Sequence, residues 1–272
     1  MKGTNMSNVR EKLWIWGHEA GSHNNVTGGD GLGLEGFSRM TPAEGAYYLG
    51  VPNLIMVRYN NKPTPPYDKH AMALSPLKRV VWSIVGNSGC TESDKVTLIC
   101  DLAARFPNIC GVMMDDFFRK PGHELGLGVY GPEEIKAIKS RLTVAGRKLD
   151  LWVVLYDHQL NFPVASHLNQ CDVVTFWTWC AKDLDMLEQN FERVDRLAPS
   201  IRKVLGCYMW DYGDHKPMPV ALMEKQCRLG LRWLQAGRID GIIFLASCIC
   251  DLGLEAVEWT RAWIGKVGDG EL

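Results

Sequence analysis

Two acidic residues in the middle of the chain stand directly after an apolar run. Residues 111–114 have the length of a buried strand, and Asp115 and Asp116 follow them at once. Adjacent carboxylates beside a buried strand are costly unless they are paired, hydrogen-bonded or used, because like charges at close range resist joint ionisation. Successive strand residues face opposite ways, so we expect one acid, with Asp115 favoured, to point into a site. The other would face a layer of helices and cap a helix or pair with Arg119.

The elements that would position these acids follow from the distribution of apolar residues. Eight apolar runs of strand length recur at residues 13–16, 54–57, 80–84, 111–114, 151–155, 173–176, 204–209 and 241–245. They are continuous rather than alternating, as expected for parallel strands covered on both faces. The segments between them show helical periodicity and start signals, such as the capping box from Thr41 to Glu44 with Pro42 at the first helical position.

Eight alternations of strand and helix that fill the chain predict the α/β class and a single (β/α)8 TIM barrel. We place the barrel at residues 13–266, between an N-terminal tail of residues 1–12 and a C-terminal tail of residues 267–272. An open, doubly wound sheet is the alternative.

Carboxylates, histidines and large aromatic residues gather at the predicted strand ends. In a barrel of this kind, the residues just past the C-terminal end of each strand face the catalytic side. The side chains found there are Trp16, His18, Glu19, Arg58, Tyr59, Asp115, Asp116, Tyr156, Asp157, His158, Trp177, Trp179, Trp210, Asp211 and Tyr212. Tryptophans in mid-strand or on predicted helices are assigned instead to packing between the strands and the helices. They are Trp14, Trp152, Trp233, Trp259 and Trp263.

This combination of side chains points to a neutral carbohydrate as substrate. Aromatic faces stack on the apolar CH face of a sugar ring, whereas carboxylate, imidazole and guanidinium groups hydrogen-bond its hydroxyls. We therefore assign the aromatic residues, the histidines, Arg58 and Asp157 of this set to substrate binding, and its four other acids to catalysis.

Cleavage of a glycosidic bond requires two carboxyl groups that flank it, about 5 Å apart for retention of configuration and roughly 6.5 to 9.5 Å apart for inversion. Asp115 or Asp116 is the expected nucleophile or base. Asp211 is the expected general acid, with Glu19 second, because aromatic residues on both sides of Asp211 would desolvate it and favour its proton-donating form. The fourth and seventh strands lie roughly opposite each other in an eight-stranded ring, which favours inversion.

Two segments give the chain a family resemblance. The Gly-hydrophobic-x-hydrophobic-Asp segment that ends at Asp115, and the Tyr-x-Trp-Asp-Tyr-Gly segment that begins at Tyr208, resemble TIM-barrel glycoside hydrolases, including chitinase-like families and groups whose nucleophile is an Asp after the fourth strand. The resemblance implies a barrel that acts on glycosidic bonds through that carboxylate. The chitinase signature has a Glu two residues after its final Asp, and this chain has Phe117 there.

Two other functions remain open at this point. The histidines and acids of the predicted mouth could hold a divalent metal in a sugar isomerase, epimerase or aldolase of barrel fold. However, no H-x-x-E or H-E-x-x-H pair places two ligands on one helical face, and we expect neither a metal nor another cofactor. The second alternative is a barrel that binds a glycan without cleaving it.

Charge and cysteine content exclude several classes of protein. The formal net charge is −1 and basic runs are short, so the sequence does not predict binding to nucleic acid. Nine cysteines form an odd count without a C-x-x-C pair, which indicates reduced core thiols. The polar N-terminus lacks the apolar region of a signal peptide, and no apolar run reaches the roughly 18 residues of a membrane span. We expect a cytoplasmic protein that does not bind membranes, with a removed signal peptide as the alternative.

Overall fold

The computed structural model describes residues 8–24, 32–60, 62–85 and 95–272. Its central feature is a closed barrel of parallel strands, in which the strands follow one another in chain order around the ring and the last pairs with the first. The strands are β1 Leu13–Gly17, β2 Asn53–Met56, β3 Arg79–Ser83, β4 Ile109–Met114, β7 Asp150–Tyr156, β8 Val173–Trp177, β9 Arg202–Tyr208 and β12 Gly241–Leu245. All eight predicted strands are present, so the single (β/α)8 barrel is confirmed and the open sheet is wrong.

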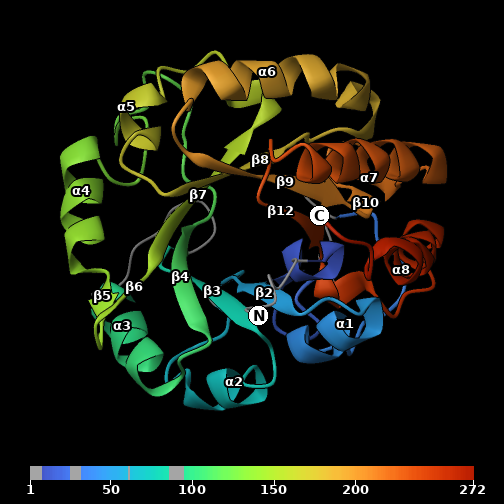
Figure 1. Ribbon diagram of the computed structural model, residues 1–272, viewed down its shortest axis with the longest axis horizontal. Helices are drawn as coiled ribbons and strands as arrows, with labels where there is room; N and C mark the ends of the chain where they lie inside the picture. Colours follow the sequence, from blue (N-terminus) through green and yellow to red (C-terminus); the bar gives the residue numbers. More distant parts are fainter. Residues whose placement is uncertain (1–7, 25–31, 61, 86–94) are drawn as a thin grey trace, which may run out of the picture.

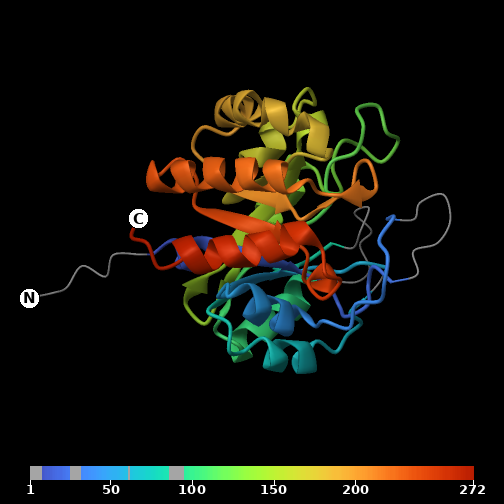
Figure 2. The same cartoon turned by 90° about the vertical axis from the view of Figure 1, so that its right-hand side faces the viewer.

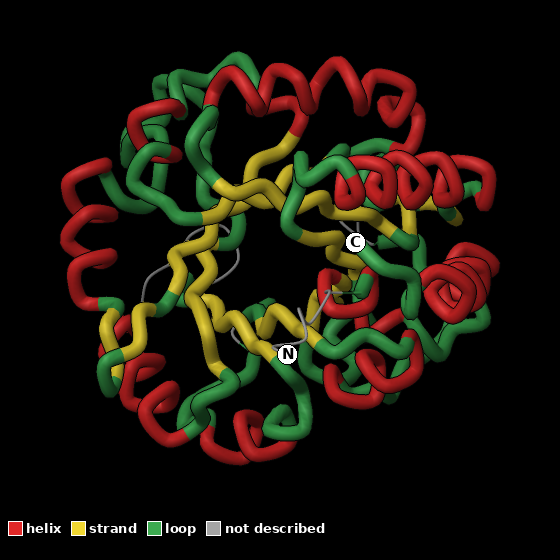
Figure 3. The backbone as a smooth tube through the Cα atoms, in the orientation of Figure 1, coloured by secondary structure: helices red, strands yellow, loops and turns green. Residues whose placement is uncertain are grey.

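Helices form an outer ring around the strands (Figures 1 and 3). The α-helices are α1 Pro42–Leu49, α2 Asp68–Ala73, α3 Lys95–Arg105, α4 Pro132–Arg141, α5 Ala165–Leu168, α6 Leu187–Leu197, α7 Val220–Gln235 and α8 Glu255–Val267. Short 3-10 helices are η1 Val9–Lys12, η3 Asp157–Gln159, η4 Ala181–Met186 and η5 Ser247–Ile249. Two small hairpins complete the fold, β5 Thr143–Val144 with β6 Arg147–Lys148, and β10 Trp210–Asp211 with β11 Lys216–Pro217.

The start of α1 shows how local sequence sets an element boundary. The Thr41 hydroxyl accepts a hydrogen bond from the backbone amide of Glu44 at 3.3 Å, and the Glu44 carboxylate accepts one from the backbone amide of Thr41 at 2.8 Å. Two amide groups that the helix itself leaves unpaired are satisfied in this way, as the capping box predicts. Gly50, with φ of 70°, ends the helix in the left-handed region that glycine adopts without strain.

Tryptophan side chains fill the inside of the barrel. Trp14 and Trp152 stand on β1 and β7, which are opposite each other in the ring, and their ring centroids are 5.1 Å apart. The assignment of these two residues to the layer between strands and helices is therefore wrong, because a mid-strand position fixes the depth of a side chain and not the face from which it leaves. Nearer the C-terminal ends of the strands, the Trp16 and Trp177 rings meet edge to face at 5.2 Å.

Gly206 on β9 makes room for one of these rings. A Cβ atom at this position would lie only 2.1 Å from the Trp177 ring, so a larger residue would displace the indole. With the interior occupied at these levels, a ligand has space only above them, at the ends of the strands.

The two ends of the barrel are built differently. At the N-terminal end of the strands, the backbone amides of Val9 and Arg10 donate to the carbonyls of Gly270 and Gly268, which ties the two terminal segments together. Figure 2 shows the C-terminus on this side and the β10–β11 hairpin on the opposite side. None of the helices in the described segments is long and apolar enough to cross a membrane. The eight described cysteines are free thiols, and Cys90 lies outside the described residues.

Candidate active site

Asp115 and Asp116 both belong to the mouth of the barrel. Gly111 lies against the Trp152 indole inside the barrel, and alternation along β4 carries this inward direction to Asp115. Asp116 has φ of 74°, in the left-handed region, so the alternation ends there and its carboxylate accepts a hydrogen bond from the Tyr156 hydroxyl at 2.7 Å. The expectation that the second acid faces the helices or pairs with Arg119 is therefore wrong. Arg119 instead donates to backbone carbonyls within its own loop.

The two carboxyl groups differ in their tendency to ionise. Burial among protein atoms raises the pKa of Asp115 well above its usual value, and the negative charge of Asp116 raises it further. The hydroxyl that bonds to Asp116 remains a donor, because burial and the same charge raise the pKa of Tyr156. A pair in which one carboxyl holds its proton while its neighbour carries the charge is the arrangement that acid–base chemistry requires.

Tyrosines from three strands surround the acid pair. The Tyr208 hydroxyl at the end of β9 hydrogen-bonds to that of Tyr156 at the end of β7, and the pKa of Tyr208 is raised by burial and then by Asp116. Tyr59, just past β2, also has a raised pKa, mainly through burial and in part through the charge of Asp116. Tyr208 was absent from the predicted site, although it begins the Tyr-x-Trp-Asp-Tyr-Gly segment, because the strand was expected to run on to residue 209.

Only part of the predicted aromatic platform is open to a ligand. Trp177 is 1% exposed, Trp16 3% and Trp210 4%, so these indoles form the floor and walls of the mouth. Trp179 is 38% exposed, and its edge contacts set it nearly perpendicular to the rings of Tyr156 and Tyr208. The exposed imidazole of His158 stacks on the Tyr156 ring, with centroids 5.3 Å apart.

A second group of rings lies on the β1 side of the mouth. His18 and His23 have ring centroids 4.7 Å apart, both contact the Tyr59 ring, and His23 Nδ1 lies 3.3 Å from the Tyr212 hydroxyl. Burial lowers the pKa of His23 to about 4, and burial followed by repulsion from His23 lowers that of His18 well below its usual value. Both imidazoles are therefore neutral at pH 7. Within the described residues, Nδ1 of His18 is buried without a hydrogen-bond partner.

His23 was not predicted, because it lies in a loop several residues past β1 and no strand pattern marks it. In the folded protein, His23 contacts Tyr59 and Tyr212, which are far from it in the sequence.

Three predicted residues occupy other environments. Asp211 is fully buried, and its Oδ1 accepts hydrogen bonds at 3.2 Å from the backbone amides of Ala181 and Asp214. Glu19 lines a separate cavity of about 310 Å³ between the first two helices. Arg58 is buried just past β2. The hydrogen bonds of Asp211 tie the β10–β11 hairpin to the loop after β8, which is a structural task.

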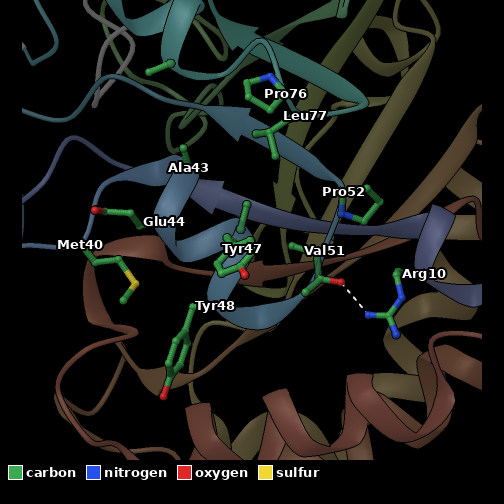
Figure 4. A pocket seen from close by; sticks show the side chains of 13 residues that line it. Arg10, Met40, Ala43, Glu44, Tyr47, Tyr48, Val51, Pro52, Pro76 and Leu77 are labelled. Atoms are coloured by element: carbon green, nitrogen blue, oxygen red, sulfur yellow. Dashed lines mark hydrogen bonds between the residues drawn. The ribbon is translucent and has the colours of Figure 1, made fainter.

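The mouth contains a cavity of about 530 Å³ whose walls include Asp116, Arg119, Tyr156, His158 and Trp179. A larger cavity of about 810 Å³ lies elsewhere, on the outer wall beside α1, and Figure 4 shows its mainly apolar lining with the Arg10 side chain bonded to the Gly50 carbonyl at one end. The outer-wall cavity is larger, but its Glu44 carboxylate is used in the capping box of α1 and its lining is mainly apolar. The mouth cavity has the Asp116 carboxylate beside Tyr156, His158 and Trp179 at the ends of the strands. We therefore regard the mouth as the candidate active site.

Among the described residues, no three or more His, Cys, Asp or Glu side chains are grouped in a way that could hold a metal ion.

Comparison with known proteins gives information about the fold. No protein-family model and no curated protein matches the chain. Its structure is similar to the glycoside hydrolase domain of PgaB (BpsB) from Bordetella bronchiseptica, at 10% identity and a TM-score of 0.54 over 96% of this chain and 99% of that chain. A GH18 chitinase from Cycas revoluta in complex with (GlcNAc)4 matches at 13% identity and a TM-score of 0.54, over 92% of this chain and 99% of that chain.

A third solved structure, of a xylanase-A-amylase inhibitor protein (XAIP-III), matches at 14% identity and a TM-score of 0.51, over 98% of this chain and 99% of that chain. At such low identities these likenesses show the fold alone. The chain is a barrel like those of glycoside hydrolase structures, and an inhibitor protein has the same fold.

Proposed function

We propose that the protein is a glycoside hydrolase-like enzyme that acts on a neutral carbohydrate, with Asp115 and Asp116 as its working carboxyl groups. The observation that carries this proposal is the pair itself: two adjacent carboxyls at the end of β4, one with a raised pKa and the other hydrogen-bonded by a tyrosine. Cleavage of a glycosidic bond needs one protonated and one ionised carboxyl group, and this pair is able to supply both.

In the proposed reaction, Asp115 is the proton donor. It transfers its proton to the glycosidic oxygen as the bond from that oxygen to the anomeric carbon breaks. The ionised Asp116, which the Tyr156 hydroxyl orients, stabilises or attacks the positive anomeric centre. Water then adds to the anomeric carbon, and its proton returns to Asp115, which restores the starting state.

The rest of the mouth suits an uncharged sugar. Neutral His18 and His23 are able to donate and accept hydrogen bonds without adding charge to the β1 side of the mouth. Trp179 presents an aromatic face beside the acid pair.

This assignment changes the partner acid that the sequence suggested. Asp211 accepts hydrogen bonds from the backbone amides of Ala181 and Asp214, and Glu19 lines a different cavity, which supports the assignment of the proton donor to Asp115 instead. The proposal therefore no longer depends on the β4 and β9 strand ends facing each other across the mouth.

Four single substitutions test the assignment: Asp115→Asn, Asp116→Asn, Asp211→Asn and Glu19→Gln. Each keeps the shape of the side chain and removes its charge. Hydrolysis would be measured on aryl glycosides and neutral oligosaccharides, with folding checked by circular dichroism. We expect kcat to fall by on the order of 10² or more in the first two variants, and Glu19→Gln to stay near the parental rate. For Asp211→Asn we expect any loss of activity to come with a loss of thermal stability.

Three results would contradict the proposal. If Asp211→Asn or Glu19→Gln is inactive at full stability while the Asp115 variant still turns over, the acid has been misassigned. If the parent binds glycans but hydrolyses none of them, the non-catalytic barrel is the correct description. Activity that disappears on dialysis against EDTA and returns with a divalent metal would favour the isomerase, epimerase or aldolase class.

A further inference from the structure

We propose that the substrate site continues past the mouth into a second subsite over η4 and α6, so that the carbohydrate is an oligosaccharide of two or more units. This inference rests on the proposed function, since it names the substrate class of the same site. Its basis is a second cavity of about 370 Å³ that adjoins the mouth cavity of about 530 Å³. The two cavities share His158 and Trp179 as walls, so they adjoin on either side of an aromatic ridge formed by these two residues.

The ridge is held rigidly by one carboxylate. Oδ1 of Asp157 accepts hydrogen bonds from the backbone amides of His158, at 2.9 Å, and Trp179, at 3.3 Å. The Asp157 side chain is only 9% exposed. Asp157 therefore acts as a positioning residue that ties together the backbone of His158 and Trp179, and such preorganisation lowers the entropic cost of binding.

The Trp179 indole is partly open to solvent beside the two cavities. The indole meets the rings of Tyr156 and Tyr208 edge to face, at interplanar angles of 83° and 89°. A packed core tryptophan is covered on both faces, but this one is 38% exposed and borders two cavities. An aromatic face in such a position is suited to the apolar face of a sugar ring next to the one that is cleaved.

The second cavity has the chemistry of a neutral sugar subsite. Beyond the ridge its walls include Asp183 on η4, Met186 at the end of η4 and Asn190 on α6. A carboxylate and a carboxamide hydrogen-bond hydroxyl groups, and the thioether, which belongs to a residue 45% exposed, adds apolar contact. Neither lysine nor arginine belongs to this lining, which includes the carboxylates of Asp157 and Asp183, so the cavity favours a neutral sugar over one with a sulfate or carboxylate substituent.

Chain-length dependence tests the second subsite. The probes are chito-, cello- and xylo-oligosaccharides of one to four units. Affinity is measured by calorimetry in an Asp115→Asn background, and kcat/KM is measured in the parent. We expect affinity for at least one series to rise on the order of tenfold between one and three units, and expect Trp179→Ala and Asn190→Ala each to remove most of that gain. The matched controls Tyr47→Ala, at an exposed aromatic on α1, and Gln189→Ala, at an exposed neighbour on α6, should keep it.

The outcomes distinguish failure of the second subsite from failure of the proposed function. If affinity does not rise with length in any series, or the rise survives in either Trp179→Ala or Asn190→Ala, the second subsite is refuted. Hydrolysis of single-unit aryl glycosides without length dependence would then leave the proposed function standing. A rise that depends on Trp179 and Asn190, in a protein whose parent hydrolyses nothing, would support the subsite and overturn the catalytic proposal.

Discussion

At the scale of single residues, the acid pair lowers the free energy of unfolding at neutral pH. Asp115 is held where ionisation is unfavourable, by burial and by the charge of Asp116. A carboxyl whose pKa is raised on folding contributes most to stability at low pH, and this contribution is lost as the pH rises towards the pKa of the folded state. The group proposed to donate the proton therefore destabilises the fold at neutral pH, a common relation between activity and stability.

The variant Asp115→Asn should consequently be more stable than the parent at pH 7. The melting temperatures of the variant and the parent should be equal near pH 3. Their difference should increase as the pH rises above 3.8, the ordinary pKa of an aspartate. Each 1 kcal/mol corresponds to roughly 2 to 4 °C in a domain of this size, so scanning fluorimetry at several pH values is able to detect it. Asp185→Asn is the control, because that side chain is 76% exposed and its substitution should change little at any pH. A lower melting temperature for the Asp115 variant at pH 7 would contradict the assignment of Asp115 as a proton donor with a raised pKa.

The site residues differ in how far the sequence could predict them. Asp115, Tyr156 and Trp179 follow strands, and position after a buried strand was enough to place them at the mouth. Asp116 could not be oriented, because its left-handed backbone interrupts the alternation from which direction is inferred. Tyr208 was missed through an error of one residue at a strand end, since such an error exchanges the inner face of the strand for the outer one.

At the scale of elements, polar groups join the two described parts of the connection after β1. The Asn24 carboxamide and the backbone of Ser38 exchange two hydrogen bonds, which bring the described ends of this connection together. His23 contacts Tyr59 and Tyr212 from two other connections, and its backbone amide donates to the Cys248 thiol. His23 therefore stands where four connections above the barrel meet, those after β1, β2, β9 and β12.

Acid should loosen this junction before it unfolds the barrel through other groups. The pKa of His23 is lowered from 6.5 to about 4, so between these values the unfolded chain binds a proton that the folded protein does not. Stability is then present above pH 6.5 and lost as the pH falls towards 4, by on the order of 3 kcal/mol if the whole shift is realised. Urea denaturation at pH 7, 5.5 and 4.5 measures this loss.

The variant His23→Gln isolates the effect of this one group, because it cannot titrate. Its stability should depend less steeply on pH over this range than that of the parent. His123→Gln, at an exposed position, should follow the parent. Parallel pH profiles for the parent and His23→Gln would show that His23 does not titrate in the way its burial implies.

At the scale of the whole molecule, continuous apolar runs were sufficient to locate the barrel. Parallel strands covered on both faces carry few polar residues, so the runs at 13–16 and 241–245 mark β1 and β12 almost to the residue. For the same reason, the sequence does not show which strand residues point into the barrel, because an apolar residue fits either face of a strand. The interior positions of Trp14 and Trp152 follow only from closure of the ring, which brings β1 opposite β7.

The thiols provide a test of the whole fold. We expect the denatured protein, prepared without reductant, to show nine reactive thiols, and at least about seven after incidental oxidation. The native protein should react much more slowly, because Cys171, Cys207, Cys227, Cys248 and Cys250 are buried. Burial also raises the pKa of several of these thiols, which lowers the fraction of reactive thiolate. Titration with a chromogenic disulfide measures both states, and a count well below seven in denaturant would reveal disulfides that the fold does not contain.

The tryptophans that fill the barrel also determine how molecules reach and leave the acids. Because the Trp16 and Trp177 rings lie beneath the mouth and the Trp14 and Trp152 rings lie deeper still, no passage runs along the barrel axis past them. A substrate bound above this floor meets solvent on one side only, so arrival and departure use the same opening. Each product therefore leaves on the same side of the barrel as the next substrate arrives.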